Sequence, residues 1–255
     1  MDELSRRQAL RGLMLGTAGV GLIVEPTSAR AETTPAAQPQ GLCTLFPQAV
    51  EGPYYFDPRL MRSDIAEGRP GLPTQLILKV IDSGPCTPIS GARVDIWHAD
   101  ARGIYSGYAS QGDNHDISTK SDTYLRGTQI SGADGTVTFR SIYPGWYPGR
   151  TPHIHVKVFL DALTLVTSQI YFENELSARI YRDRQPYAAR PKQDTDNNSD
   201  FIFKSEEHEG GGIIFTVKDK PDLLVASLII AVDRTGDAAK RAMGWGPYFR
   251  QLIGL

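Results

Sequence analysis

The segment from Tyr143 to His155, with the sequence Y-P-G-W-Y-P-G-R-T-P-H-I-H, constrains this chain more than any other. It begins as a loop punctuated by proline and glycine, and it leads into an apolar stretch that ends at Leu160. Such a stretch is typical of a β-strand. On a strand, His153 and His155 point to one face while Ile154 points to the other. The segment therefore predicts a strand over residues 153–160 that presents two neighbouring imidazoles directly after a loop.

Paired imidazoles on one face of a strand supply half the ligands of a typical metal site. The preceding loop carries Tyr147 and Arg150 back towards the same face, so a phenolate is a candidate third ligand. A histidine pair at this spacing is also common as a partly exposed pair without a metal, and a nearby tyrosine is often only a buried ring. The metal-site hypothesis therefore depends on whether other parts of the chain point to the same chemistry.

The composition is typical of a soluble globular domain. The chain has 255 residues, of which 40% are hydrophobic and 22% are charged, which is enough for one well-cored domain. The formal net charge is −2 and the body of the chain has no basic block. These features argue against binding to nucleic acid or to an anionic membrane surface.

The N-terminal residues are expected to direct export. Ser5-Arg6-Arg7-Gln8-Ala9-Leu10-Arg11 is a twin-arginine pattern, followed by a weakly apolar stretch and by the small-x-small sequence Ala29-Arg30-Ala31. The apolar stretch is shorter than the about 20 residues that a membrane span needs. We therefore expect a signal peptide over residues 1–31, a linker over 32–40 and one domain over 41–255. The mature protein is expected in the periplasm or outside the cell, without a stable membrane anchor.

The chain has two cysteines, Cys43 and Cys86. In an oxidising compartment such a pair is expected to form one disulfide. Two buried free thiols are the alternative, and the sequence leaves both open.

The rest of the pattern predicts an all-β fold with little helix. Runs rich in β-branched residues are bounded by proline and glycine clusters, and Asp134-Gly135 marks a hairpin turn. Helical periodicity is weak apart from a short stretch near residues 238–243. We expect a β-sandwich of about seven or more strands with long active-site loops. The expected strands cover residues 75–82, 92–98, 136–142, 153–160, 165–172, 212–217 and 223–232.

Two long stretches show no regular pattern, residues 106–126 and 181–205. Loops of this length in a compact domain are either functional or disordered. We expect the first to lie beside the site and the second to be a solvated excursion.

Four motifs together resemble the intradiol ring-cleavage dioxygenases, the enzymes of the catechol and protocatechuate 3,4-dioxygenase type. The motifs are E-G-P-Y-Y at residues 51–55, V-D-I-W-H-A-D-A-R-G-I-Y-S at 94–106, the segment at 143–155, and Q-I-Y-F at 169–172. They follow the family's order. The resemblance covers residues 51–172 and extends more loosely to about residue 233.

This resemblance implies one non-haem Fe(III) per chain, held by two tyrosinates and two histidines. The matching ligand positions are Tyr105, Tyr147, His153 and His155. Arg150 matches an active-site arginine that stabilises negative charge on the ring, and Gln169 matches a glutamine beside the reacting carbon. The residues that match a loop lining the substrate pocket are Gly52, Pro53 and Tyr54.

The implied chemistry suits these residue types. Fe(III) is a hard cation that prefers anionic oxygen, and two phenolates with a hydroxide would offset its charge. The partners would be O2 and a small aromatic diol, which would enter as a dianion as Tyr147 and the hydroxide carry away its protons. Cleavage between the two hydroxyl-bearing carbons would give a cis,cis-muconate-type product. Catechol, protocatechuate, hydroxyquinol and lignin-derived diols stay open as substrates, and so does assembly into a homo-oligomer.

Two other functions compete with this one. A cupin-like metal site would need a glutamate four or five residues after His155, where Phe159 and Leu160 stand. A catalytically silent β-sandwich that binds a ligand or partner would have no physical need for a second tyrosine at position 105. Among the other candidates, His98 is expected to be structural, and Trp146 is expected to pack the loop.

Overall fold

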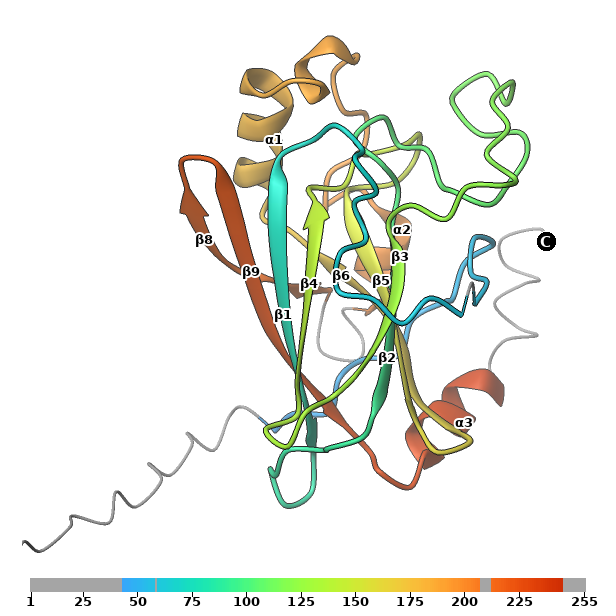
Figure 1. Cartoon of the computed structure of the whole chain (residues 1–255), viewed down its shortest axis with the longest axis vertical. Helices are drawn as coiled ribbons and strands as arrows, with labels where there is room; N and C mark the ends of the chain where they lie inside the picture. Colours follow the sequence, from blue (N-terminus) through green and yellow to red (C-terminus); the bar gives the residue numbers. More distant parts are fainter. Residues whose placement is uncertain (1–42, 58, 207–211, 245–255) are drawn as a thin grey trace, which may run out of the picture. The chain divides into compact units, whose positions relative to one another are not determined.

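The computed structural model describes residues 43–57, 59–206 and 212–244. Within them the chain forms nine β-strands in two sheets (Figure 1). One sheet has the strand order β4-β1-β9-β8 and the other has the order β3-β2-β5-β6-β7. The predicted all-β sandwich is confirmed. The strands are β1 (Pro73–Asp82), β2 (Arg93–Trp97), β3 (Arg126–Ile130), β4 (Thr136–Ile142), β5 (His153–Leu160), β6 (Leu163–Tyr171), β7 (Ile213–Ile214), β8 (Thr216–Lys220) and β9 (Leu223–Val232).

The main core lies between the two sheets because alternate residues of the strands are apolar. In β5, Ile154, Val156 and Val158 are fully buried in it, and Leu76 and Leu78 of β1, from the other sheet, belong to the same core. Each such side chain contributes about 1.5–3 kcal/mol relative to an exposed position. This burial fixes the orientation of β5 and sends its histidines to the opposite face.

The bounds of β4, β5 and β9 agree with the prediction, while β1, β2 and β6 differ from it by one or two residues. The strand predicted at residues 212–217 is instead two strands, β7 and β8, which belong to different sheets. Phe215 separates them and is buried at 3% exposure. The chain turns this ring into the core where it crosses between the sheets. Strand β3 is not predicted by the sequence pattern.

The prediction of a solvated excursion over residues 181–205 is wrong. Helix α1 (Asn174–Asp183) ends inside it, a 3-10 turn η1 follows at Tyr187–Ala189, and helix α2 (Phe201–Glu206) begins near its end. Asn197 and Asp200 of this segment are buried, so the segment packs against the body of the domain. The predicted short helix near residues 238–243 is present as α3 (Asp237–Gly244), and α1 and α3 lie at opposite ends of the sandwich (Figure 1). Within the described residues, no helix is long and apolar enough to cross a membrane.

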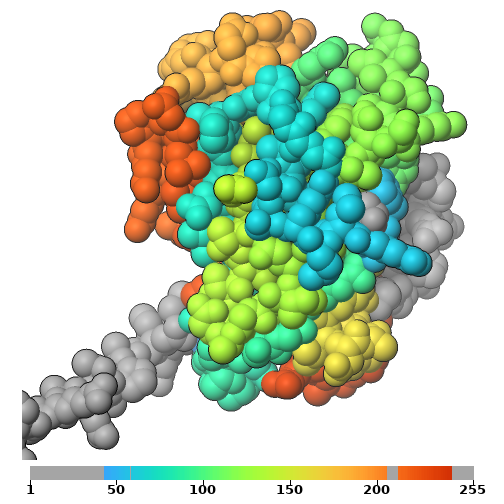
Figure 2. Space-filling view, viewed as in Figure 1, coloured from blue at the N-terminus to red at the C-terminus, as the bar shows by residue number. Residues whose placement is uncertain are grey.

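The chain before β1 closes the open edge between the two sheets. Met61 bridges to Thr128 of β3, and Asp64 bridges to Arg140 of β4. Figure 2 shows this segment, in blue and cyan, spread over the surface of the molecule. Further upstream, a disulfide joins Cys43 to Cys86, with the two Cα atoms 5.6 Å apart. The predicted signal peptide and linker lie outside the described residues.

Candidate active site

Four buried side chains form a row across four neighbouring strands. The strand register pairs Arg126 of β3 with Trp97 of β2, Trp97 with His155 of β5, and His155 with Gln169 of β6. Residues paired across strands point to the same face of a sheet, and each of these four is at most 2% exposed. His153 lies on this face too, because it is two residues from His155. The predicted shared face of the two histidines is therefore confirmed, and it is the face turned away from the main core.

Two tyrosines from loops bring their hydroxyl groups to the histidine nitrogens. Tyr105 follows β2, and its hydroxyl oxygen lies 3.3 Å from Nε2 of His153 and 3.2 Å from Nε2 of His155. Tyr147 follows β4, and its oxygen lies 3.3 Å from Nε2 of His153. Ligand atoms held tetrahedrally at metal distances of 2.0–2.1 Å are about 3.3 Å apart. The four side chains thus converge with the spacing of a metal coordination sphere.

The protonation states of these groups suit a metal site. The Nδ1 of His153 lies 2.7 Å from the carbonyl oxygen of Thr151, so this nitrogen donates its proton and Nε2 keeps its lone pair. Burial, with the charge of Arg150, lowers the pKa of His153 and His155 well below the usual value, so both imidazoles are neutral. Burial raises the pKa of Tyr105 and of Tyr147. Their deprotonation therefore requires a cation between them.

No group of three or more His, Cys, Asp or Glu side chains suited to a metal occurs in the described part of the chain. The candidate donor set combines two imidazoles with two phenols.

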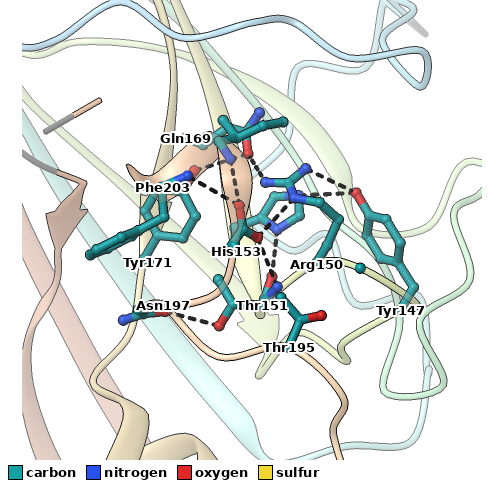
Figure 3. Close-up of polar contacts among 12 residues, drawn as sticks. Tyr147, Arg150, Thr151, His153, Gln169, Tyr171, Thr195, Asn197 and Phe203 are labelled. Atoms are coloured by element: carbon teal, nitrogen blue, oxygen red, sulfur yellow. Dashed lines mark hydrogen bonds and ion pairs between the residues drawn. The ribbon is translucent and has the colours of Figure 1, made fainter. Parts of the chain in front are cut away.

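Arg150 lies between Tyr147 and Gln169, as Figure 3 shows. Its Nη1 donates to the Tyr147 oxygen at 3.3 Å, and its Nη2 donates to Oε1 of Gln169. Its Nε donates to Oδ2 of Asp200 at 2.9 Å. Burial opposes the charged form, but Tyr147 and Asp200 together raise the pKa of Arg150 above its ordinary value. Arg150 therefore brings a permanent positive charge to the edge of the donor set.

Asp200 is a residue of the site that the sequence prediction missed. It is fully buried and accepts four N–H groups. Oδ2 accepts from Nε of Arg150 and from the backbone of Thr151, both at 2.9 Å. Oδ1 accepts from the backbone of Ile202 at 2.9 Å and of Phe203 at 3.0 Å, which caps α2. An aspartate directly before the apolar run Phe-Ile-Phe is a helix-start signal that could have drawn attention to it.

Gln169 connects the site to the segment that precedes β1. Its Nε2 donates to the carbonyl oxygen of Val50 at 3.0 Å, and its Oε1 accepts from Tyr171 at 3.2 Å as well as from Arg150. The orientation of the Gln169 amide is therefore fixed. Val50 lies two residues before Gly52, so this hydrogen bond also holds the predicted pocket segment near the histidines.

Of the three predicted pocket residues, two border the donor groups. Gly52 has a φ of +73°, and a Cβ atom at this position would lie 3.4 Å from Cε1 of His155. The ring of Tyr54 stacks on Tyr105 with a centroid distance of 4.5 Å and an interplanar angle of 24°. Pro53 is exposed between them.

Arg126 fastens this pocket segment to the loop that carries Tyr105, a role that the sequence prediction missed. It donates to the carbonyl oxygen of Tyr54 at 2.6 Å, and to the hydroxyl and carbonyl oxygens of Ser106 at 2.9 Å and 2.8 Å. Its guanidinium lies 4.4 Å from the ring centroid of Phe56. Burial lowers the pKa of Arg126 to about 10, so the group stays cationic at neutral pH.

The remaining candidates lie outside the donor set. His98 is 1% exposed, and its ring nitrogens contact Oγ of Ser141 at 2.7 Å and the carbonyl oxygen of Ala99 at 2.8 Å, so its predicted structural role is confirmed. Trp146 is buried under the guanidinium of Arg190, at 4.3 Å from the ring centroid, and packs its loop as predicted.

Comparisons with known proteins agree with this geometry. A family model described as Dioxygenase matches residues 50–200. Catechol 1,2-dioxygenase 1 of Acinetobacter lwoffii is 28% identical over 153 residues, which are 51% of this chain and 47% of that protein. The protocatechuate 3,4-dioxygenase beta chain of Burkholderia cepacia is 29% identical over 129 residues, 47% of this chain and 53% of that protein. The matched part spans about half the length of these two curated relatives.

Solved structures cover more of the chain. An intradiol ring-cleavage dioxygenase from Tetranychus urticae is 33% identical, with a TM-score of 0.67, over 75% of this chain and 95% of that one. The dioxygenase domain of a dioxygenase and carbohydrate-binding protein fusion from Streptomyces sp. SirexAA-E is 26% identical, with a TM-score of 0.53, over 74% of this chain and 98% of that one. With the family model, these matches show that the chain belongs to the intradiol ring-cleavage dioxygenase family.

Proposed function

We propose that this chain is a non-haem iron dioxygenase that opens catechol-type rings between the two hydroxyl-bearing carbons. The observation that carries the proposal is the convergence of two phenol oxygens and two imidazole nitrogens at 3.2–3.3 Å. The names of the relatives support the substrate class, since they are dioxygenases of catechol, chlorocatechol, hydroxyquinol and protocatechuate.

The donor set fits one ferric ion per chain. Tyr105, Tyr147, His153 and His155 would hold it, since a hard trivalent cation prefers anionic oxygen and accepts neutral imidazole. Two phenolates and one hydroxide would offset the three positive charges. When bound, the ion supplies the Lewis acidity that deprotonates the phenols and the diol, and the redox chemistry that couples the ring to O2.

The two tyrosines have different surroundings, which assigns them different roles. Tyr105 is 1% exposed and is held under the ring of Tyr54. Tyr147 is only half-buried, and Nη1 of Arg150 donates to its oxygen. Tyr147 can therefore move aside without losing a positive partner for its phenolate. We assign it as the group that accepts a proton from an incoming diol at its phenolate oxygen, while Tyr105 stays in place.

Arg150 also provides the positive charge for the reacting ring. Its guanidinium is held from behind by Asp200, and it is directed at Tyr147 and Gln169 on the substrate side. A preorganised cation stabilises negative charge that develops on the ring, and no rearrangement is needed when the reaction occurs. Gln169 orients this guanidinium by accepting one of its N–H groups.

The proposal is tested by product analysis with isotopically labelled O2. The full chain, loaded with iron, is supplied with catechol, protocatechuate and hydroxyquinol in turn. At least one diol should give a cis,cis-muconate-type diacid that contains both labelled oxygen atoms. His153→Ala should abolish the product, whereas His115→Ala, which alters an exposed histidine, should not. Iron-loaded protein that leaves every diol intact would instead support the silent-sandwich reading.

We also propose that the protein works outside the cytoplasm on extracellular aromatic diols, such as those derived from plant material. The twin-arginine pattern at Arg6 and Arg7 supports export. The bond between Cys43 and Cys86 supports an oxidising compartment, where disulfides persist. Changing both arginines to lysine should retain the precursor in the cytoplasm. Equal secretion of the changed and unchanged precursors would contradict this localisation.

A further inference from the structure

The two candidate histidine ligands are held in different ways. The Nδ1 of His153 has a hydrogen-bond partner, the carbonyl oxygen of Thr151 at 2.7 Å. The Nδ1 of His155 is buried and has no hydrogen-bond partner among the described residues. A histidine that binds a metal usually donates this proton to a neighbouring group, which fixes the plane of the ring. Something else must therefore fix the plane of His155.

Trp97 lies flat against His155. The two ring centroids are 4.7 Å apart and the planes differ by 9°, which is a stacked pair. The stack follows from the sheet, because Trp97 and His155 are directly paired in the register of β2 and β5. Directly paired residues on one face have their Cβ atoms close together. Rotation of the imidazole about its χ2 bond would drive its edge into the indole.

The indole itself is held from the outer side. The ring of Tyr55 packs on Trp97 at a centroid distance of 4.7 Å, and the hydroxyl of Tyr55 donates to Oδ2 of Asp95 at 2.9 Å. Trp97 is 1% exposed, so it has no space to swing away. Its own Nε1 is buried without a hydrogen-bond partner in the described part of the chain. The indole therefore makes no hydrogen bond within the described residues, and its contribution at this position comes from its flat ring.

The edge of His155 is confined as well. A Cβ atom placed on Gly52 would lie 3.4 Å from Cε1 of His155, which is an ordinary contact distance. The backbone of Gly52 therefore passes close to one side of the imidazole, while Trp97 covers one face. Both contacts direct Nε2 of His155 towards the oxygen of Tyr105 at 3.2 Å.

We infer that Trp97 is a positioning residue for the metal site, which orients His155 by stacking in place of the usual hydrogen bond to Nδ1. This inference rests on the proposed function, because His155 is taken as an iron ligand. It adds a residue that touches neither iron nor substrate and acts through the imidazole plane.

The test compares iron affinity in three variants of the full chain, measured by competition with a chelator. Trp97→Leu removes the stack and fills most of the space, Trp97→Phe restores a flat ring, and Phe139→Leu alters a fully buried ring of β4 in the main core. Trp97→Leu should weaken iron binding about 10–100-fold, as loss of the partner of a ligand typically does. It should also broaden the visible tyrosinate-to-iron band. Trp97→Phe should recover most of the affinity, and Phe139→Leu should keep it within about twofold despite lower stability.

Three results would overturn the inference. Iron affinity and a visible band in Trp97→Leu equal to those of the unchanged chain would show that the stack does not position His155. An equal loss of affinity in Phe139→Leu would assign the effect to general stability. If the Trp97→Leu chain does not fold, Trp97→Met is measured in its place. Absence of iron binding by the unchanged chain would refute the proposed function together with this inference, whereas the first two results leave the proposed function intact.

Discussion

Replacement of Asp200 by asparagine should damage both stability and turnover. The carboxylate is the buried counter-charge of Arg150, whose side chain is only 14% exposed. An asparagine has one oxygen and can satisfy only one of the two pairs of N–H groups that Asp200 now accepts. If the oxygen stays on Ile202 and Phe203, where it caps α2, the amide nitrogen faces the N–H groups of Arg150 and Thr151.

The magnitude follows from the burial of the pair. Removing one partner of a buried ion pair leaves an uncompensated charge and costs about 3–5 kcal/mol. Arg179 and Asp219 provide a matched control, because they form an ion pair whose side chains are 52% and 46% exposed. Asp219→Asn should therefore lose only about 0–1 kcal/mol. Because Arg150 would no longer be held behind the site, kcat of Asp200→Asn should also fall about 100-fold.

Urea unfolding of both variants at pH 7 and steady-state ring cleavage provide the two measurements. Iron content of Asp200→Asn should stay near one per chain, since none of the four candidate ligands is changed. The reasoning is refuted if Asp200→Asn loses no more stability than Asp219→Asn, or if its kcat equals that of the unchanged chain.

Three further changes test other parts of the molecule. Tyr147→Phe keeps the ring contacts with Tyr105 and His153, so the free energy of unfolding should change by about 1 kcal/mol or less. Iron affinity should fall and the visible absorption band should shift. Unchanged iron binding would contradict the assignment of Tyr147 as a ligand. Burial lowers the pKa of His98 to about 4 from 6.5. The neutral imidazole therefore leaves the free energy of unfolding intact above pH 6.5, and about 3 kcal/mol of it is lost as the pH falls towards 4. In urea unfolding of the iron-free chains between pH 6.5 and 4, the unchanged chain should therefore lose about 3 kcal/mol more than His98→Asn does; parallel pH curves would refute the assignment. Cys86→Ser opens a bridge between residues 43 apart in sequence and should cost about 4 kcal/mol, a difference that should vanish in reductant.

The sequence predicts best those parts of the fold in which one face of an element is apolar. Strand β5 has Ile154, Val156 and Val158 on one face and the histidines on the other, so both its bounds and its orientation follow from alternation. Strand β3 has no such alternation, since its first residue is the buried Arg126 and its last, Ile130, is 49% exposed. Arg126 lies against the rings of Phe56 and Tyr108, which other segments contribute and which local periodicity cannot show.

Helix α1 was not predicted although one of its faces is apolar. Its buried residues are Leu176, Ser177 and Ile180, so its apolar face is narrow and includes a serine. That serine is buried because its hydroxyl hydrogen-bonds to Tyr143 at 2.7 Å, a contact between segments far apart in the chain. Leu176 and Ile180 lie one turn apart on the buried face, so the helix is amphipathic, but it is only ten residues long and most of its other residues are polar.

The candidate site was predictable where its residues are close in sequence or share a motif. Tyr147, Arg150, His153 and His155 lie within one short segment, and the resemblance supplies Tyr105. Asp200 lies in a polar stretch 50 residues after Arg150, and nothing local links the two. The stack of Trp97 on His155 depends on the register of β2 against β5, which is set by packing across the whole sheet.

The central claim is that Tyr105, Tyr147, His153 and His155 bind one iron. The most direct test is a visible spectrum of the purified protein, with the iron quantified, before and after anaerobic addition of catechol. The account predicts a coloured protein with about one iron per chain, whose absorption band shifts to longer wavelength when catechol binds. A protein that stays colourless after reconstitution with iron would contradict it.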